Sequence, residues 1–181
     1  RFEESWGPFL KRFHNVMPAS MTEVAEKLKS NVAYVVSSIG ESPRTLIHGD
    51  FRLDNLFFSN GKDGVALAAV DWQVVSKSKG VFEGAYFLAW SLQPEQRRAK
   101  EMDLLGMYHS MLLDNGVAGY DFDQCLKEYR LLMLFPFIRL VTVGVNSDLS
   151  HRRLVRLLRT LTERTVAAIT DLKSVDLLPS A

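Results

Sequence analysis

The sequence predicts an α+β protein that is mostly helical and carries one β-hairpin. Apolar residues recur at three- and four-residue intervals over most of the chain, which is the period of amphipathic helices. Between residues 45 and 70, short apolar runs alternate with turn residues, which is typical of short strands. A chain of 181 residues, 47% of them hydrophobic, is long enough to bury one sizeable core. We therefore expect a single domain over residues 1–181.

The segment before residue 45 is expected to be mainly helical. Ser20 or Thr22 is a candidate N-cap for a helix that runs to about Ser38, and Gly40 and Pro43 mark its end. Its apolar residues follow the helical period: Val24, Leu28, Val32, Val35 and Val36. This helix is expected to serve as scaffold.

Three short strands are predicted next. The apolar runs lie at residues 45–47, 56–58 and 65–70, and the last is rich in β-branched and small residues. Ser-Asn-Gly-Lys-Asp-Gly at residues 59–64 is strong turn chemistry. The second and third runs are therefore predicted to form a hairpin.

The predicted hairpin brings two oxygen donors together. An antiparallel pairing centred on Asp63 sets Asn55 opposite Asp71, with Cβ atoms about 5 Å apart. Mg²⁺ is usually held by one or two protein groups, with water and substrate phosphates as its other ligands, so these two residues are predicted to bind it. Asp50 precedes them on the same loop, where it can orient an acceptor hydroxyl and take its proton. Arg52 offers positive charge to a transferring phosphoryl group.

Helices are predicted for the rest of the chain. One begins at Pro94, because proline is tolerated in a first helical turn, and ends near Asn115 and Gly116. The next is capped by Asp121 or Asp123.

The helix capped by Asp121 or Asp123 is apolar on almost every side from Leu131 to Val145, so it should be buried, and Pro136 should kink it or break a backbone hydrogen bond within it. A last helix is predicted from Ser150 to about Leu172, and residues 175–181 are expected to form a tail.

The segment 48–55, His-Gly-Asp-Phe-Arg-Leu-Asp-Asn, resembles the aminoglycoside phosphotransferase and choline kinase family, which has a kinase-like fold. The shared pattern is His-Gly-Asp-x-x-x-x-Asn followed by a strand-borne Asp, and protein kinases carry a related set. The resemblance implies that Asp50 is the catalytic residue and that Asn55 and Asp71 hold Mg²⁺ beside ATP. Arg52 stands where protein kinases carry a phosphate-contacting Lys.

Two supporting residues follow from the same resemblance. His48 is expected to brace the catalytic loop by hydrogen bonds rather than to act as a base. Glu83 stands where the family generally has an Asp that steadies the core, so its longer side chain departs from the pattern. Trp72 and Gln73 replace the Phe-Gly of protein kinases, which argues against their type of activation switch.

The resemblance covers one lobe of a kinase-like fold. No Gly-rich loop and no Val-Ala-Ile-Lys-like strand precedes the motif, and in kinases both belong to the N-terminal lobe that covers the phosphates. We expect the chain to be the C-terminal lobe, with the N-terminal lobe absent by excision or truncation, and to be inactive alone. An exposed apolar surface where that lobe would dock favours self-association.

Composition narrows the classes of partner. A net charge of +1 gives no reason to expect nucleic acid or an anionic membrane as a partner. Cys125 is the only cysteine, which excludes an internal disulfide and a Cys-based zinc site. No apolar stretch approaches the roughly 20 residues of a membrane span, and the start lacks the pattern of a signal peptide. A cytoplasmic location fits these features.

The last predicted helix carries a basic face. That face is formed by Arg152, Arg156, Arg159 and Glu163, opposite four leucines. A solvated surface is the simpler interpretation, and docking of an acidic substrate or partner is the alternative.

The motif thus predicts transfer of the ATP γ-phosphoryl group to a hydroxyl of a small molecule. Two other classes stay open. A catalytically silent kinase-like binding or regulatory module would keep the fold without productive nucleotide binding. A magnesium-dependent phosphohydrolase would need a nucleophile or a second metal.

Overall fold

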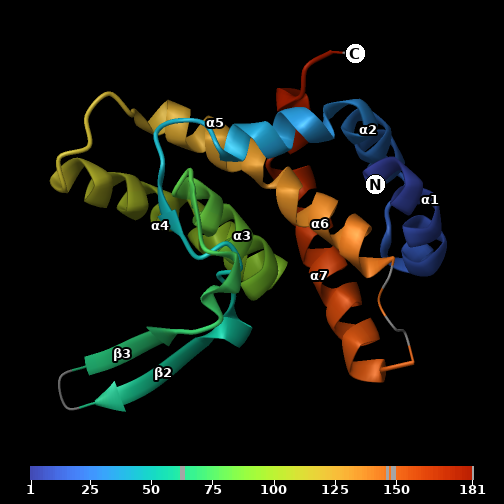
Figure 1. Ribbon diagram of the computed structural model, residues 1–181, viewed down its shortest axis with the longest axis horizontal. Helices are drawn as coiled ribbons and strands as arrows, with labels where there is room; N and C mark the ends of the chain where they lie inside the picture. Colours follow the sequence, from blue (N-terminus) through green and yellow to red (C-terminus); the bar gives the residue numbers. More distant parts are fainter. Residues whose placement is uncertain (62–63, 146, 148–149, 181) are drawn as a thin grey trace.

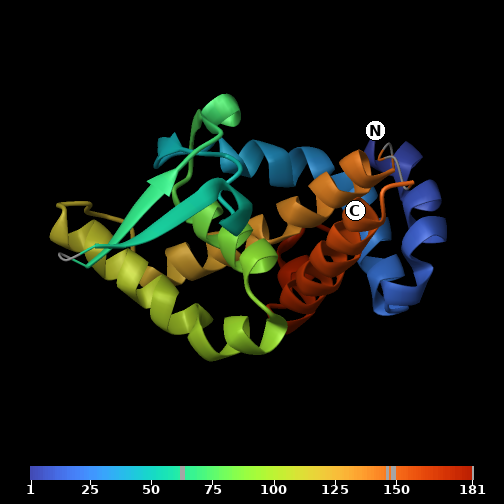
Figure 2. The ribbon, with the colours of Figure 1, turned by 90° about the horizontal axis from the view of Figure 1, so that it is seen from below.

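Seven α-helices and two small antiparallel sheets make up the part of the chain that the computed structural model describes, residues 1–61, 64–145, 147 and 150–180 (Figure 1). One sheet is the hairpin of β2 (Leu56–Gly61) and β3 (Gly64–Ala69), which projects away from the helices (Figures 1 and 2). The other pairs β1 (Thr45–Ile47) with β4 (Ser76–Ser78) at the base of that hairpin. The mostly helical α+β class is therefore confirmed.

The helices predicted from Ser20 or Thr22, from Pro94 and from Ser150 are confirmed close to their predicted bounds, whereas α1 and α3 had no predicted bounds. The helix bounds are α1 Phe2–Phe13, α2 Ser20–Ile39, α3 Val81–Ser91, α4 Pro94–Asp114, α5 Phe122–Leu132, α6 Leu134–Gly144 and α7 Arg152–Asp171. Short 3-10 turns occur at His14–Val16, Leu53–Asn55, Trp72–Val74 and Ser174–Leu177. Among the described residues, no helix has both the length and the apolar character needed to cross a bilayer.

The two predicted helix caps have different outcomes. Asp121 caps α5 as predicted, because its side chain accepts a hydrogen bond from the Gln124 N–H at 2.7 Å. The predicted cap of α2 is wrong, since the helix follows Ala19 without a side-chain cap. Backbone carbonyls of Pro18 and Ala19 accept the N–H groups of the first turn instead.

The single helix predicted to run through Pro136 is wrong, because the structure has two helices that meet at Met133, three residues before the proline. α5 ends at Leu132 and α6 begins at Leu134, so the proline lies in the first turn of α6, where its missing N–H breaks no helical bond. α6 is largely buried, and the Phe137 ring packs against three rings of α1 at centroid distances of 5.9, 6.4 and 6.5 Å. This aromatic cluster packs α1 against α6.

The predicted tail is ordered over most of its length, which corrects that expectation. Residues 174–177 form a 3-10 turn in which Ser174 is buried, and Val175 and Leu177 pack against the core. The guanidinium of Arg130 also holds the end of α7, with Nε donating to the Leu172 carbonyl at 2.7 Å. The segment stays against the core because its apolar side chains are removed from water and because Arg130 satisfies a backbone carbonyl at its start. Residue 181 lies outside the described residues.

The register of the hairpin differs from the prediction by one residue. Gly61 pairs with Gly64, and the Val70 N–H donates to the Asn55 carbonyl at 3.0 Å, so Asn55 opposes Val70 rather than Asp71. Both strands extend into the predicted turn, so that two residues connect them. With an even number of connecting residues, the midpoint of the hairpin falls between two residues, whereas the prediction placed it on one residue. Asp63, the predicted centre, lies outside the described residues.

Candidate active site

The loop between β1 and β2 is braced by a buried histidine. His48 is 2% exposed, its Nε2 lies 2.7 Å from the Val70 carbonyl oxygen, and its Nδ1 accepts the Asp50 N–H at 3.2 Å. This network assigns the ring proton to Nε2. The Trp72 ring packs on the imidazole at 4.7 Å between centroids. These contacts are consistent with a histidine that braces the loop. The bracing role of His48 stays a prediction.

A carboxylate from α3 holds the same loop from the other side. Glu83 Oε2 and Oε1 accept the backbone N–H groups of His48 and Gly49, each at 3.0 Å. Burial raises the pKa of this carboxyl, and the two hydrogen bonds oppose that shift only in part. The longer side chain, which departs from the family pattern, still reaches both N–H groups.

The loop also requires a glycine. Gly49 has a φ of +82°, and a Cβ at this position would lie 2.6 Å from the Val74 carbonyl oxygen. Any side chain would therefore be strained and would collide with the backbone. The Gly49 carbonyl accepts a hydrogen bond from Arg139 at 3.3 Å.

Asp50 lies at the centre of this arrangement and is 7% exposed. Its Oδ1 accepts the Tyr86 hydroxyl at 2.8 Å and lies 3.5 Å from Arg139, whereas Oδ2 contacts Asn55 Nδ2 at 3.2 Å and Arg52 Nε at 3.5 Å. Burial alone would raise the pKa of this carboxyl, but these donors and positive charges outweigh burial and lower it. Asp50 is therefore ionised at neutral pH.

The two predicted metal ligands lie at the base of the hairpin. Asn55 Nδ2 donates to the carbonyl and the carboxylate of Asp50, at 2.9 and 3.2 Å, which leaves Oδ1 without a hydrogen bond among the described residues. Asp71 follows β3 with a left-handed backbone, φ 66° and ψ 54°, and its exposed carboxylate has no ion pair with any described residue. Two open oxygen donors fit Mg²⁺, provided that water and phosphate supply the remaining ligands.

Other groupings of metal-binding side chains are absent from the described residues. No set of three or more His, Cys, Asp or Glu side chains there could hold a metal ion. Binding of Mg²⁺ by Asn55 and Asp71 therefore stays a prediction.

Arg52 makes an ion pair within the loop. Its NH1 lies 2.6 Å from Asp54 Oδ2, so the two residues form a salt bridge. Contact with a phosphoryl group stays a prediction.

Sequence reasoning missed Tyr86 and Arg139. Arg139 is the only charged residue of α6, and its guanidinium lies over the rings of Tyr86 and Trp90 at 5.4 and 5.9 Å. A charge within a buried apolar helix requires a partner, and that signal was available in the sequence. Tyr86 gave a weaker signal, as a polar tip within an apolar run.

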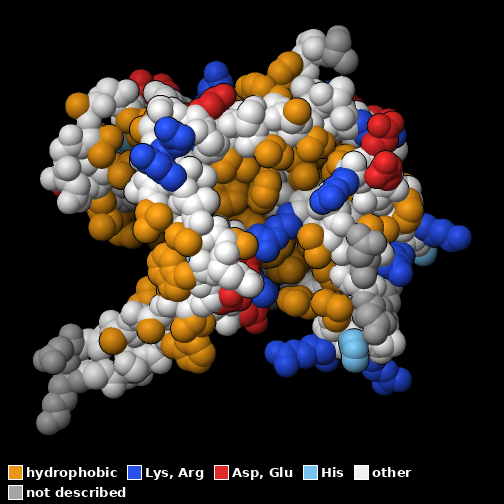
Figure 3. Space-filling view, viewed as in Figure 1, with side chains coloured by type: hydrophobic (Ala, Val, Ile, Leu, Met, Phe, Trp, Pro, Cys, Tyr) orange, Lys and Arg blue, Asp and Glu red, His pale blue; other side chains and the backbone are white. Residues whose placement is uncertain are grey.

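Exposed apolar side chains gather on the hairpin and its flanks (Figure 3). Phe57 and Val65 are 61% and 68% exposed. The others are Leu46, Phe58, Leu67, Val70, Trp72, Val74 and Val75. The register places Phe58, Val65 and Leu67 on one face of the hairpin and Phe57 on the other, because successive strand residues point to opposite faces.

A mostly helical body with an aspartate, an asparagine and a strand-end aspartate around one hairpin is compatible with a kinase-like lobe. A sequence model of the ecdysteroid kinase-like family matches residues 2–117, more than half of the chain, so the chain belongs to this family. The match contains every predicted site residue. It confirms a kinase-like family in a related branch of the superfamily of choline kinases and aminoglycoside phosphotransferases, and not the exact family that the motif suggested. Comparisons with curated proteins and with solved structures find no significant match.

Proposed function

We propose that the protein is an ATP-dependent phosphotransferase that moves the γ-phosphoryl group to a hydroxyl of a small molecule. One observation carries this proposal: the ionised carboxylate of Asp50 is fixed beside Asn55, whose side-chain oxygen is open, and Asp71 directly follows Val70, the residue that pairs with Asn55 at the base of the hairpin. Membership of a kinase-like family supports the same reaction class.

The state of Asp50 suits phosphoryl transfer. Its lowered pKa makes it a weak base, so it accepts the hydroxyl proton late, after the bond to phosphorus has begun to form. In a loose transition state, orientation of the hydroxyl matters more than early deprotonation. Tyr86 and Arg139 fix Oδ1 and thereby set the orientation of the carboxylate.

Asn55 and Asp71 are the residues that would hold Mg²⁺. When bound, the ion neutralises charge on the nucleotide phosphates. Arg52, already in contact with Asp50 and Asp54, adds positive charge on the same side of the loop.

The exposed apolar hairpin is the surface on which a nucleotide-covering lobe is proposed to pack. Phe58, Val65 and Leu67 share one face of the hairpin, and such packing would bury them. Without that lobe the chain is expected to be inactive, and the same surface is the one proposed for self-association.

The experiment is transfer of labelled γ-phosphate from ATP to a pool of hydroxylated small molecules by the full-length protein. Asp50→Asn is expected to reduce transfer about 10²- to 10⁴-fold. Asp103→Asn, an exposed position within α4, is the matched control and should transfer at the wild-type rate. Full activity of Asp50→Asn would contradict the proposed role. Release of phosphate to water alone would indicate a phosphohydrolase, and no ATP turnover would indicate a silent module.

A further inference from the structure

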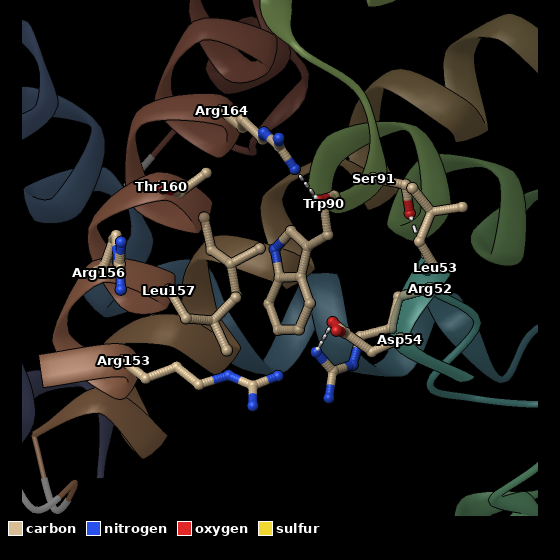
Figure 4. Close-up of a pocket in the computed structure, with 11 residues that line it drawn as sticks. Arg52, Leu53, Asp54, Trp90, Ser91, Arg153, Arg156, Leu157, Thr160 and Arg164 are labelled. Carbon is tan, nitrogen blue, oxygen red and sulfur yellow. Dashed lines mark hydrogen bonds and ion pairs between the residues drawn. The ribbon is translucent and has the colours of Figure 1, made fainter. Parts of the chain in front are cut away.

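A cavity of about 460 Å³ lies between the catalytic loop, the end of α3 and α7 (Figure 4). We name it the arginine cavity after the four arginines that line it: Arg52, Arg153, Arg156 and Arg164. Asp54 is the one acidic residue in its lining. The volume of the arginine cavity is within the range of small-molecule sites.

The described residues do not neutralise the positive charge of this cavity. Asp54 pairs with Arg52, whereas Arg153 and Arg156 make no hydrogen bond or ion pair with any described residue. Arg164 donates to the Trp90 carbonyl at 2.6 Å, yet its Nε is buried without a partner. Burial lowers the pKa of this guanidinium, which is the direction expected for a cation that lacks a countercharge. An anion would remove this imbalance.

Part of the cavity lining is apolar. Trp90, Leu157 and Leu161 line the arginine cavity and also a smaller cavity of about 150 Å³ that reaches Asp50 and Arg139. Figure 4 shows Arg153 extending from α7 toward the Arg52 and Asp54 pair, with the Trp90 ring beside Leu157. An apolar surface therefore connects the unpaired arginines with the proposed catalytic aspartate.

We propose that the arginine cavity binds an amphipathic anion, an apolar small molecule that carries a carboxylate, sulfate or phosphate. Arg153 and Arg156 take the anionic group, and the apolar part lies along Trp90. Resting on the phosphotransferase function proposed above, this molecule is the hydroxyl acceptor, with its hydroxyl directed to Asp50. The proposal favours the alternative interpretation of the basic helix face, in which it docks an acidic substrate.

The helix itself provides a matched control. Arg159 pairs with Glu163 at 3.1 Å, and neither Arg152 nor Arg159 lines the cavity. Replacing Arg153 and Arg156 by Gln, or Arg152 and Arg159 by Gln, removes the same charge from the same helix at exposed positions. Only the first pair should affect the cavity.

The experiment is calorimetric titration of the chain with ω-hydroxydodecanoate, with its neutral methyl ester and with inorganic sulfate, in the absence of nucleotide and metal. The hydroxy acid should bind about tenfold or more tightly than the ester, because the two guanidinium groups bind its charge. The R153Q/R156Q variant should lose that difference, and R152Q/R159Q should keep it. Circular dichroism of both variants checks that they are folded.

Three results would overturn the proposal. They are equal binding of acid and ester, equal losses in the two variant pairs, and sulfate binding as tight as that of the hydroxy acid, which would indicate a site for simple anions. Because no nucleotide is present, failure of phosphoryl transfer in the separate assay would overturn the proposed function and leave the anion site standing.

Discussion

Replacing Glu83 by Gln tests how the catalytic loop is held. The carboxylate accepts the N–H groups of His48 and Gly49, each at 3.0 Å. Glutamine has one oxygen, so one N–H group would face the amide nitrogen and lose its acceptor. A lost hydrogen bond to a charged group that leaves a buried donor unsatisfied costs about 2–3 kcal/mol of unfolding free energy. For a chain of this size the melting temperature should fall by about 4–12 °C.

The cost should depend on pH. Burial raises the folded-state pKa of Glu83 above its ordinary value of 4.5, so the folded chain holds this proton more tightly than the unfolded chain does. The wild type therefore loses stability as pH rises from about 4.5 through the folded-state pKa, whereas the glutamine does not titrate. The stability difference between wild type and Glu83→Gln should narrow over that interval.

Urea unfolding followed by circular dichroism measures both effects. Glu95→Gln is the control, because Glu95 lies exposed in the first turn of α4 and its ion pair with Arg98 is 3.7 Å long. This control should be indistinguishable from the wild type. A loss below about 0.5 kcal/mol for Glu83→Gln, or a difference that widens with pH, would refute the reasoning.

Three further substitutions test the same site. Tyr86→Phe removes the hydroxyl that donates to Asp50 at 2.8 Å, and it should cost about 1–3 kcal/mol at pH 7 in chemical unfolding. The lowered pKa of Asp50 means that its stabilising contribution is present above about pH 3.8 and is lost as pH falls through the folded-state pKa, so an equal cost at pH 3 would contradict this assignment. His48→Ala leaves the Asp50 N–H and the Val70 carbonyl without their side-chain partner and should cost about 2–5 kcal/mol of unfolding free energy. Replacement of the exposed His14 by Ala should leave stability unchanged, and similar melting temperatures for the two variants would contradict the bracing role. Arg139→Leu removes a positive charge 3.5 Å from Asp50 and should therefore raise the pKa of Asp50. The acid limb of the pH–activity profile should move to higher pH, and an unchanged acid limb would contradict this role of Arg139.

Much of the helical part of the fold could be predicted because local signals agree there. Helical periodicity located α2 and α4, and a single proline explained why one apolar run became α5 and α6. β4 was missed, since Ser-Lys-Ser at residues 76–78 has no apolar alternation and is a strand only through its pairing with β1.

The site was predictable in its motif and not in its long-range partners. Asp50 and Asn55 are joined by hydrogen bonds over a short stretch of chain, and the motif places both on one loop. The register failed because turn residues indicate a hairpin without fixing the length of its connection. Arg139 contacts Asp50 from 89 positions further along the chain, and only packing of α6 onto the loop brings them together.

The lining of the arginine cavity could be predicted only in part from the sequence. The basic face of α7 could be read from the sequence, but which of its arginines face the catalytic loop depends on how the helix is rotated against α3. Arg153 and Arg164 were outside the predicted face and line the cavity, whereas Arg159 pairs on the surface. Tertiary packing decides this orientation.

Calorimetric titration of the full-length protein with Mg-ADP tests the central claim most directly. The predicted result is binding by the wild type and by Asp103→Ala, with loss of binding in Asp71→Ala, because Asp71 supplies one of the two open oxygen donors at the base of the hairpin. Equal binding by Asp71→Ala, or no binding by the wild type, would contradict the claim that this loop and hairpin form a phosphotransfer site.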